Sequence, residues 1–127
     1  AAAIQRSGGL VGVGGHAEVQ GMSFHWEMWA YAMGGMSTAE ILRAATIDAA
    51  YIIGSPEDLG SIEIGKLADM VVLNSNPLAD IRNSIDIERV IQNGRLYDAD
   101  TLEQQWPEQV SFPETWRQTD EENPPGF

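Results

Sequence analysis

The sequence contains no cysteine, few basic residues and no long apolar run. Without cysteine, disulfide bonds, thiol catalysis and cysteine-ligated zinc are excluded. Only 7 lysine and arginine residues stand against 19 aspartate and glutamate residues, which gives a formal net charge of −12. Such a chain repels phosphate backbones and anionic lipid surfaces. No apolar run approaches the ~18 residues that a membrane-spanning helix needs. We therefore expect neither nucleic acid nor a membrane as a partner.

The first half of the chain has the pattern of an α/β protein. Residues 10–13 are apolar and lie between glycine pairs, which predicts a strand buried on both faces and paired in parallel. Residues 16–23 form a polar, glycine-containing loop at the C-terminal end of this strand, where ligand-binding loops gather in α/β folds. Residues 24–33 are apolar almost all round, which predicts a largely buried helix.

A second helix is predicted from a capping box at its start. Ser37 and Glu40 have the spacing at which each side chain bonds the other's backbone N–H. Apolar residues then recur at helical spacing as far as Ile53, and Gly54 is a natural end.

From Gly60 the pattern changes from helix to strand. Alternation predicts a strand at 61–64, and an apolar run predicts another at 69–73, with Asp69 orienting a turn. A hairpin of type I′ is predicted at Asn93-Gly94, because both residues tolerate positive φ. The remaining expectations are a short helix from Pro77 to Ile81, one or two helical turns at 101–106, and disorder after about residue 119.

This layout is predicted to be incomplete as a folding unit. One parallel strand needs parallel neighbours, and the few later strands would leave unpaired edges and a bare apolar face. The chain also opens on three alanines without an initiator methionine. We therefore expect a fragment that pairs with a missing N-terminal part of the same protein or a companion chain, or that associates with itself as an oligomer.

The candidate chemistry rests on two histidines, each two positions before a glutamate: His16 with Glu18, and His25 with Glu27. Zinc normally takes three or four protein ligands, so these residues supply at most part of a site. The same spacing opens the nucleobase-deaminase signature, but that signature also requires cysteines. His16 follows the predicted strand and is the candidate ligand or catalytic group, with a loop histidine bonded to carbonyl groups as the alternative.

The other polar residues carry weaker signals. His25 begins an apolar helix, where a structural role competes with a functional one. Glu18 and Glu27 fit solvated or capping groups. Ser23 lacks the G-x-S-x-G elbow of a nucleophile. The glycines around residues 8–15 lack the lysine of a phosphate loop and are expected to serve turns and close packing.

The order of these motifs resembles the C-terminal part of the metal-dependent amidohydrolase superfamily, particularly its imidazolonepropionase-like and prolidase-like branch. The resemblance is carried by GGH at 14–16, GMSTAEILRAAT at 35–46, GSIEIGKLADMVVL at 60–73, NPL at 76–78 and VIQNGR at 90–95. It extends to about Tyr97 and so covers most of the chain.

The resemblance implies an α/β fold made of the last strand and helices of a (β/α)8 barrel, followed by strands of a small β-sandwich. Residues 1–58 would close the barrel, residues 59–98 would belong to the composite sandwich, and residues 99–127 would be an extension. The family hydrolyses C–N bonds in small or peptide-like substrates with one or two divalent metals, zinc being the expected one, that activate water.

The resemblance also implies roles for three residues. His16 takes the position where the family usually has an aspartate that binds metal and accepts the water proton, so it is the predicted metal ligand and catalytic group. His25 and Glu27 would shape the same mouth and bind substrate. Most metal ligands of the family lie upstream of this segment, so the chain alone would be inactive and would bind no metal by itself. Because imidazole is a different base from a carboxylate, a non-catalytic scaffold or interaction module is the alternative.

Overall fold

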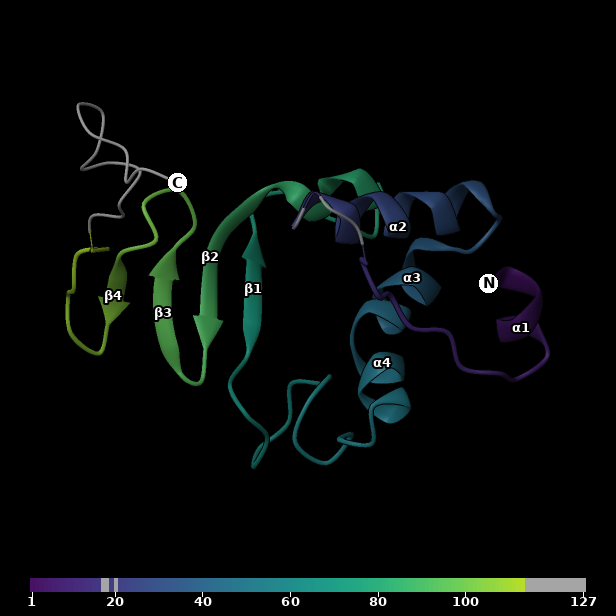
Figure 1. The fold of residues 1–127 in the computed structure, drawn as a ribbon, viewed down its shortest axis with the longest axis horizontal. Coiled ribbons are helices and arrows are strands. Elements are labelled where there is room, and N and C mark those ends of the chain that lie inside the picture. The colour runs from purple at the N-terminus through teal and green to yellow at the C-terminus, as the bar shows by residue number, and fades with distance from the viewer. Residues whose placement is uncertain (17–18, 20, 114–127) are drawn as a thin grey trace, which may run out of the picture.

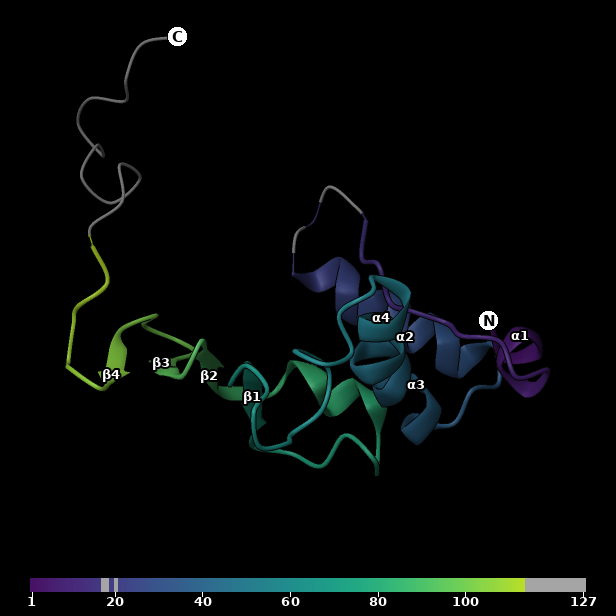
Figure 2. The same ribbon diagram turned by 90° about the horizontal axis from the view of Figure 1, so that it is seen from below.

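The computed structural model describes residues 1–16, 19 and 21–113 and has helices at one end and a sheet at the other (Figure 1). The helices are α1 (Ala2–Arg6), α2 (Met22–Met33), α3 (Thr38–Ala45), α4 (Ile47–Ile52) and the 3-10 helix η1 (Ile81–Ile85). The strands are β1 (Met70–Leu73), β2 (Ile87–Gln92), β3 (Arg95–Asp98) and β4 (Gln104–Trp106). Seen from below in Figure 2, β2 to β4 extend away from the helices as a single layer that no described helix covers. The chain is thus an α/β structure with its two parts placed side by side.

The core lies where α2, α3 and η1 meet. Its buried apolar residues are Val11, Met28, Met36, Ile41, Ala44 and Ile81. Ile41 is completely buried, and its neighbours come from segments on both sides of it in the chain. This small cluster fixes the position of α2 relative to the segment that precedes it.

The capping box at the start of α3 is confirmed. The Ser37 hydroxyl accepts the Glu40 backbone N–H at 3.3 Å, and the Glu40 carboxylate accepts the Ser37 backbone N–H at 2.7 Å. The single helix predicted to continue to Ile53 is instead two helices, because the backbone at Thr46 has φ −130° and ψ −101°. Gly54 follows the last turn at φ +81°, as expected of a glycine after a helix end.

Replacing Ser37 by alanine should lower the free energy of unfolding by about 1 kcal/mol, because the Glu40 N–H loses its side-chain partner. Urea-induced unfolding of the purified protein would measure this loss. Glu40→Gln keeps an oxygen that can accept the Ser37 N–H, so it should lose less than Ser37→Ala. Equal stability of Ser37→Ala and the wild type would show that water replaces the cap at no cost.

The sheet is antiparallel throughout, in the order β1-β2-β3-β4. The predicted hairpin between β2 and β3 is confirmed, with Gln92 paired to Arg95 and positive φ at both Asn93 (48°) and Gly94 (75°). Asp69 does orient a turn, because its carboxylate accepts the Asn93 backbone N–H at 2.6 Å. The first strand of the sheet is thereby tied to the hairpin turn.

Several predictions of local structure were wrong. Residues 10–13 form no strand: Leu10 is exposed, and the Val13 N–H donates to the Ala44 carbonyl at 3.1 Å instead of to a neighbouring strand. Residues 61–64 also form no strand, and Ile62 and Ile64 are exposed. A strand forms only beside a partner, and the described part of the chain places none next to these two segments.

Two further corrections concern α2 and the end of the chain. The α2 helix begins at Met22, and it is not largely buried, because Trp26 and Met33 are 47% and 84% exposed. Residues 101–106 form no helical turns; β4 pairs with β3 there. The disorder expected after residue 119 lies outside the described residues. The division into segments 1–58, 59–98 and 99–127 stays a prediction.

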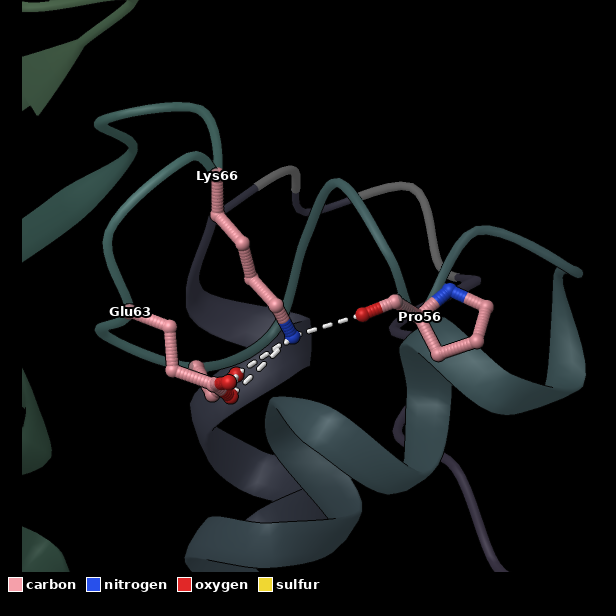
Figure 3. Close-up of polar contacts among 4 residues, drawn as sticks. Pro56, Glu63 and Lys66 are labelled. Atoms are coloured by element: carbon pink, nitrogen blue, oxygen red, sulfur yellow. Dashed lines mark hydrogen bonds and ion pairs between the residues drawn. The ribbon is translucent and has the colours of Figure 1, made fainter.

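The loop that precedes β1 is held by Lys66 (Figure 3). Its side chain is only 12% exposed, and its amine donates to the Pro56 carbonyl and to the Ser61 hydroxyl, both at 2.6 Å. The Glu63 carboxylate lies 3.3 Å from the same amine and also accepts a hydrogen bond from Ser61. A largely buried amine with three partners satisfies its donors, so the GSIEIGK motif is explained here as a structural loop.

Candidate active site

A cavity of about 350 Å³ lies between the N-terminal end of α2 and the segment before it, lined by Gly14, Gly15, His16, Ser23 and Glu27. Two residues predicted for the site, His16 and Glu27, are therefore brought together. The third, His25, does not line this cavity. The cavity lies beside the residues that follow 10–13, and a ligand-binding role for it stays a prediction.

Glu27 binds the backbone of the segment that leads to His16. One carboxylate oxygen, Oε2, accepts the N–H groups of Gly14 at 2.9 Å and Gly15 at 2.7 Å. The other, Oε1, lies 2.6 Å from the Tyr31 hydroxyl. Partial burial raises the pKa of Glu27, but the hydrogen bonds from Tyr31, Gly15 and Gly14 outweigh it and hold the pKa below its usual value. The carboxylate is therefore ionised near neutral pH.

Ser23 holds the same segment from the preceding turn of α2. Its buried hydroxyl donates to the Gly15 carbonyl at 2.7 Å. Gly15 has φ +58°, and a Cβ there would lie 3.1 Å from the Phe24 Cα, so the helix and the loop approach too closely for a side chain. The glycine directly before His16 is thus explained by close packing, whereas a Cβ at Gly14 would meet only the Glu27 carboxylate, at 4.0 Å.

His25 points to a different part of the fold. Its Nδ1 lies 2.9 Å from the hydroxyl of Ser84, a buried residue of η1. Burial lowers the pKa of His25, which favours the neutral imidazole near pH 7. Its contact therefore joins α2 to η1, and its predicted role in substrate binding stays a prediction.

Tyr31 should remain protonated to unusually high pH. Partial burial and the neighbouring Glu27 carboxylate raise the pKa of its hydroxyl from 10 to about 12. The folded protein therefore holds this proton more tightly than the unfolded chain. The stability that this provides is complete below about pH 10 and is lost as the pH rises through about 12.

Alkaline difference spectroscopy at the tyrosinate band would test this, with wild type compared to Tyr31→Phe. The variant should lack one late-titrating tyrosine and should leave the earlier part of the curve unchanged. A difference curve centred near the ordinary tyrosine pKa would contradict the contact with Glu27.

The described residues do not make a metal site by themselves. No group of three or more His, Asp or Glu side chains among them is placed to hold a metal ion. His16 can supply one nitrogen ligand, whereas the Glu27 carboxylate is already engaged by the backbone and Tyr31. Any complete metal site would need ligands from outside these residues.

No described helix is long and apolar enough to cross a membrane.

Comparison with known proteins identifies the family. The sequence profile of the amidohydrolase family matches residues 14–97, a range that begins at the cavity and ends in β3. The chain belongs to the amidohydrolase family. Among curated relatives, this amidohydrolase chain is 40% identical over 65 residues to the imidazolonepropionase of Symbiobacterium thermophilum. It is 36% identical over 69 residues to that of Brevibacillus brevis.

These alignments cover 49% and 52% of the chain but only 15% and 16% of the two relatives. Solved structures of similar proteins support the same family. An amidohydrolase from Thermotoga maritima superposes with a TM-score of 0.62 at 29% identity, covering 73% of this chain and 24% of that one. A Xaa-Pro dipeptidase with methionine bound in its active site gives 0.57 at 33% identity, covering 60% and 19%.

Sequence reasoning missed two residues of the site. Ser23 was given no role, and Tyr31 was considered only as part of an apolar helix. The available signal was their spacing, because Ser23, Glu27 and Tyr31 recur every four residues and so share one face of a helix. Glu27 was expected to be solvated or capping, yet its partners are the backbone of another segment.

Proposed function

We propose that this chain forms the C-terminal part of a metal-dependent amidohydrolase that hydrolyses C–N bonds in small or peptide-like molecules. The observation that carries the proposal is the position of the cavity. Its polar lining, including His16, lies at the start of the region that matches the family, in the loop that follows residues 10–13. Relatives named imidazolonepropionase and a structure named as a Xaa-Pro dipeptidase support a C–N bond as the target.

In the complete protein, residues 10–13 would find the strand neighbours that they lack here and would close a (β/α)8 barrel. The sheet would be completed to a sandwich by strands from the same protein or a companion chain, which would cover β2 to β4, the strands that extend away from the helices. The short share of each relative that aligns with this chain supports such a missing part.

His16 would be one ligand of a divalent metal, zinc being the expected one, with the remaining ligands supplied by that missing part. The metal, when bound, would polarise the scissile carbonyl group and activate water. What this chain contributes is the imidazole at the cavity, held on a backbone segment that α2 fixes. Because no three His, Asp or Glu side chains among the described residues are grouped to hold a metal, we propose that the chain alone is inactive.

A second candidate is a non-catalytic amidohydrolase-like scaffold or interaction module. It is favoured by the histidine at position 16, where the resemblance places an aspartate. A neutral imidazole can bind metal, but its basicity differs from that of a carboxylate, so it is not an equivalent acceptor for the water proton.

Elemental analysis and an amidase assay of the complete polypeptide that carries these residues would separate the two candidates. For the enzyme, we expect a stoichiometric divalent metal and hydrolysis of a Xaa-Pro dipeptide or a cyclic amide. Chelation should abolish the hydrolysis, and zinc should restore it. A folded protein with no zinc, manganese or iron and no turnover of either substrate would favour the scaffold.

A further inference from the structure

One face of α2 holds the main chain that leads to His16. Its three polar residues, Ser23, Glu27 and Tyr31, follow one another at intervals of four and therefore form a row along the helix. Ser23 and Glu27 bond the segment at residues 12–15 directly. Tyr31 donates its proton to Glu27 and lies beside the Gly12 carbonyl of the same segment. We call this row the α2 polar row.

The α2 polar row forms hydrogen bonds with the main-chain N–H and carbonyl groups of residues 12–15 and so restrains this segment. The Gly14 and Gly15 N–H groups donate to Glu27, and the Gly15 carbonyl accepts from Ser23. The Tyr31 hydroxyl lies 2.9 Å from the Gly12 carbonyl. Both polar groups of Gly15, the residue directly before His16, are thus bonded to α2.

Glycine makes this restraint necessary. A segment with glycine at 12, 14 and 15 has a large backbone entropy, so without partners its shape and the place of the next side chain would vary. Glu27 is the centre of the row because a carboxylate has about four acceptor positions, and three of its partners are visible here. Hydrogen bonds to an ionised oxygen are the stronger kind.

We propose that Glu27, supported by Ser23 and Tyr31, is a positioning residue that fixes the main chain at Gly14-Gly15 and thereby the place of the His16 imidazole. The metal-binding role of His16 in this inference rests on the proposed function. The restraint of residues 12–15 by α2 does not depend on it. It assigns Glu27 a role different from the contact with substrate that the sequence suggested.

The test uses the complete protein and two measurements, hydrogen–deuterium exchange of the peptide spanning residues 12–16 and the apparent affinity for Zn²⁺ against a competing chelator. Glu27→Ala should speed the exchange of the Gly14 and Gly15 amides about tenfold or more, because their charged acceptor is lost. It should weaken Zn²⁺ binding by about 10–100-fold, as the loss of groups that orient a metal ligand does. Glu27→Gln retains an acceptor oxygen and should restore most of both properties.

Asp98→Ala is the matched control, because the Asp98 carboxylate also accepts two backbone N–H groups, those of Asp100 and Thr101, but in a turn beyond β3. It should change exchange in its own turn and leave residues 12–16 and Zn²⁺ affinity unchanged. Unchanged exchange at residues 12–16 in Glu27→Ala would overturn the proposal. So would faster exchange with wild-type Zn²⁺ affinity. A wild-type protein that binds no Zn²⁺ would instead overturn the proposed function, and the exchange measurement would then decide the restraint by itself.

Discussion

Gly60→Ala should lower the free energy of unfolding by about 2–5 kcal/mol, the sum expected for backbone strain and overpacking. Gly60 has φ +89°, a conformation that side chains disfavour. A Cβ there would lie 2.8 Å from both the Ala50 Cβ and the Ile47 Cα and 3.0 Å from the Thr46 carbonyl oxygen. The contacts are with backbone and with a short side chain, so neither can rotate away.

Gly65→Ala is the matched control within the same motif. Gly65 also has positive φ, +101°, but nothing lies within 4 Å of a Cβ built on it. This variant should therefore lose only the strain, about 1–2 kcal/mol. Urea-induced unfolding of both variants measures the difference. If the two losses were equal, the close approach of the loop to α4 would have no energetic weight, and the first glycine of the motif would serve the turn alone.

Local features of the fold could be predicted from the sequence where neighbouring residues alone decide them. The capping box needs only Ser37 and Glu40, and the hairpin turn needs only Asn93 and Gly94. In both cases the interacting groups lie within a few residues of each other. The sequence therefore sufficed to predict them, although the hairpin turn also bonds Ala68 and Asp69 from before β1.

Predictions failed where a distant partner decides the outcome. Residues 10–13 and 61–64 have the composition of strands, but no described strand lies beside them, and their backbone groups bond elsewhere or face solvent. The opposite occurred at β4, whose residues gave no strand pattern and yet pair with β3. The break at Thr46 had no sequence signal either, since apolar spacing continues through it.

The site shows the same division. His16 was predicted from its place after an apolar run, which is a local signal, and it lines the cavity. The roles of Glu27 and Tyr31 depend on contacts with Gly12, Gly14 and Gly15, which lie 12 to 19 residues away. Helical spacing could have placed the two side chains on one face, but it does not reveal what that face contacts.

His16→Ala should have the largest effect on activity of any single change in this chain. If the imidazole is a metal ligand at the cavity, its loss should lower kcat in the complete protein by about a hundredfold or more. Metal content after dialysis should fall as well. Because His16 is exposed and has no described hydrogen bond, the melting temperature of the metal-free protein should be unchanged.

His25→Ala separates this role from a general effect of losing a histidine. It removes the contact with Ser84 and so should lower stability, but His25 does not line the cavity and metal content should persist. A raised KM in His25→Ala with unchanged kcat would support the substrate contact that the resemblance implies. Wild-type metal content and kcat in His16→Ala would make His16 a surface histidine. The proposal that this cavity is catalytic would then fail, because the other side chains that line it, Ser23 and Glu27, are already hydrogen-bonded to the Gly14-Gly15 segment.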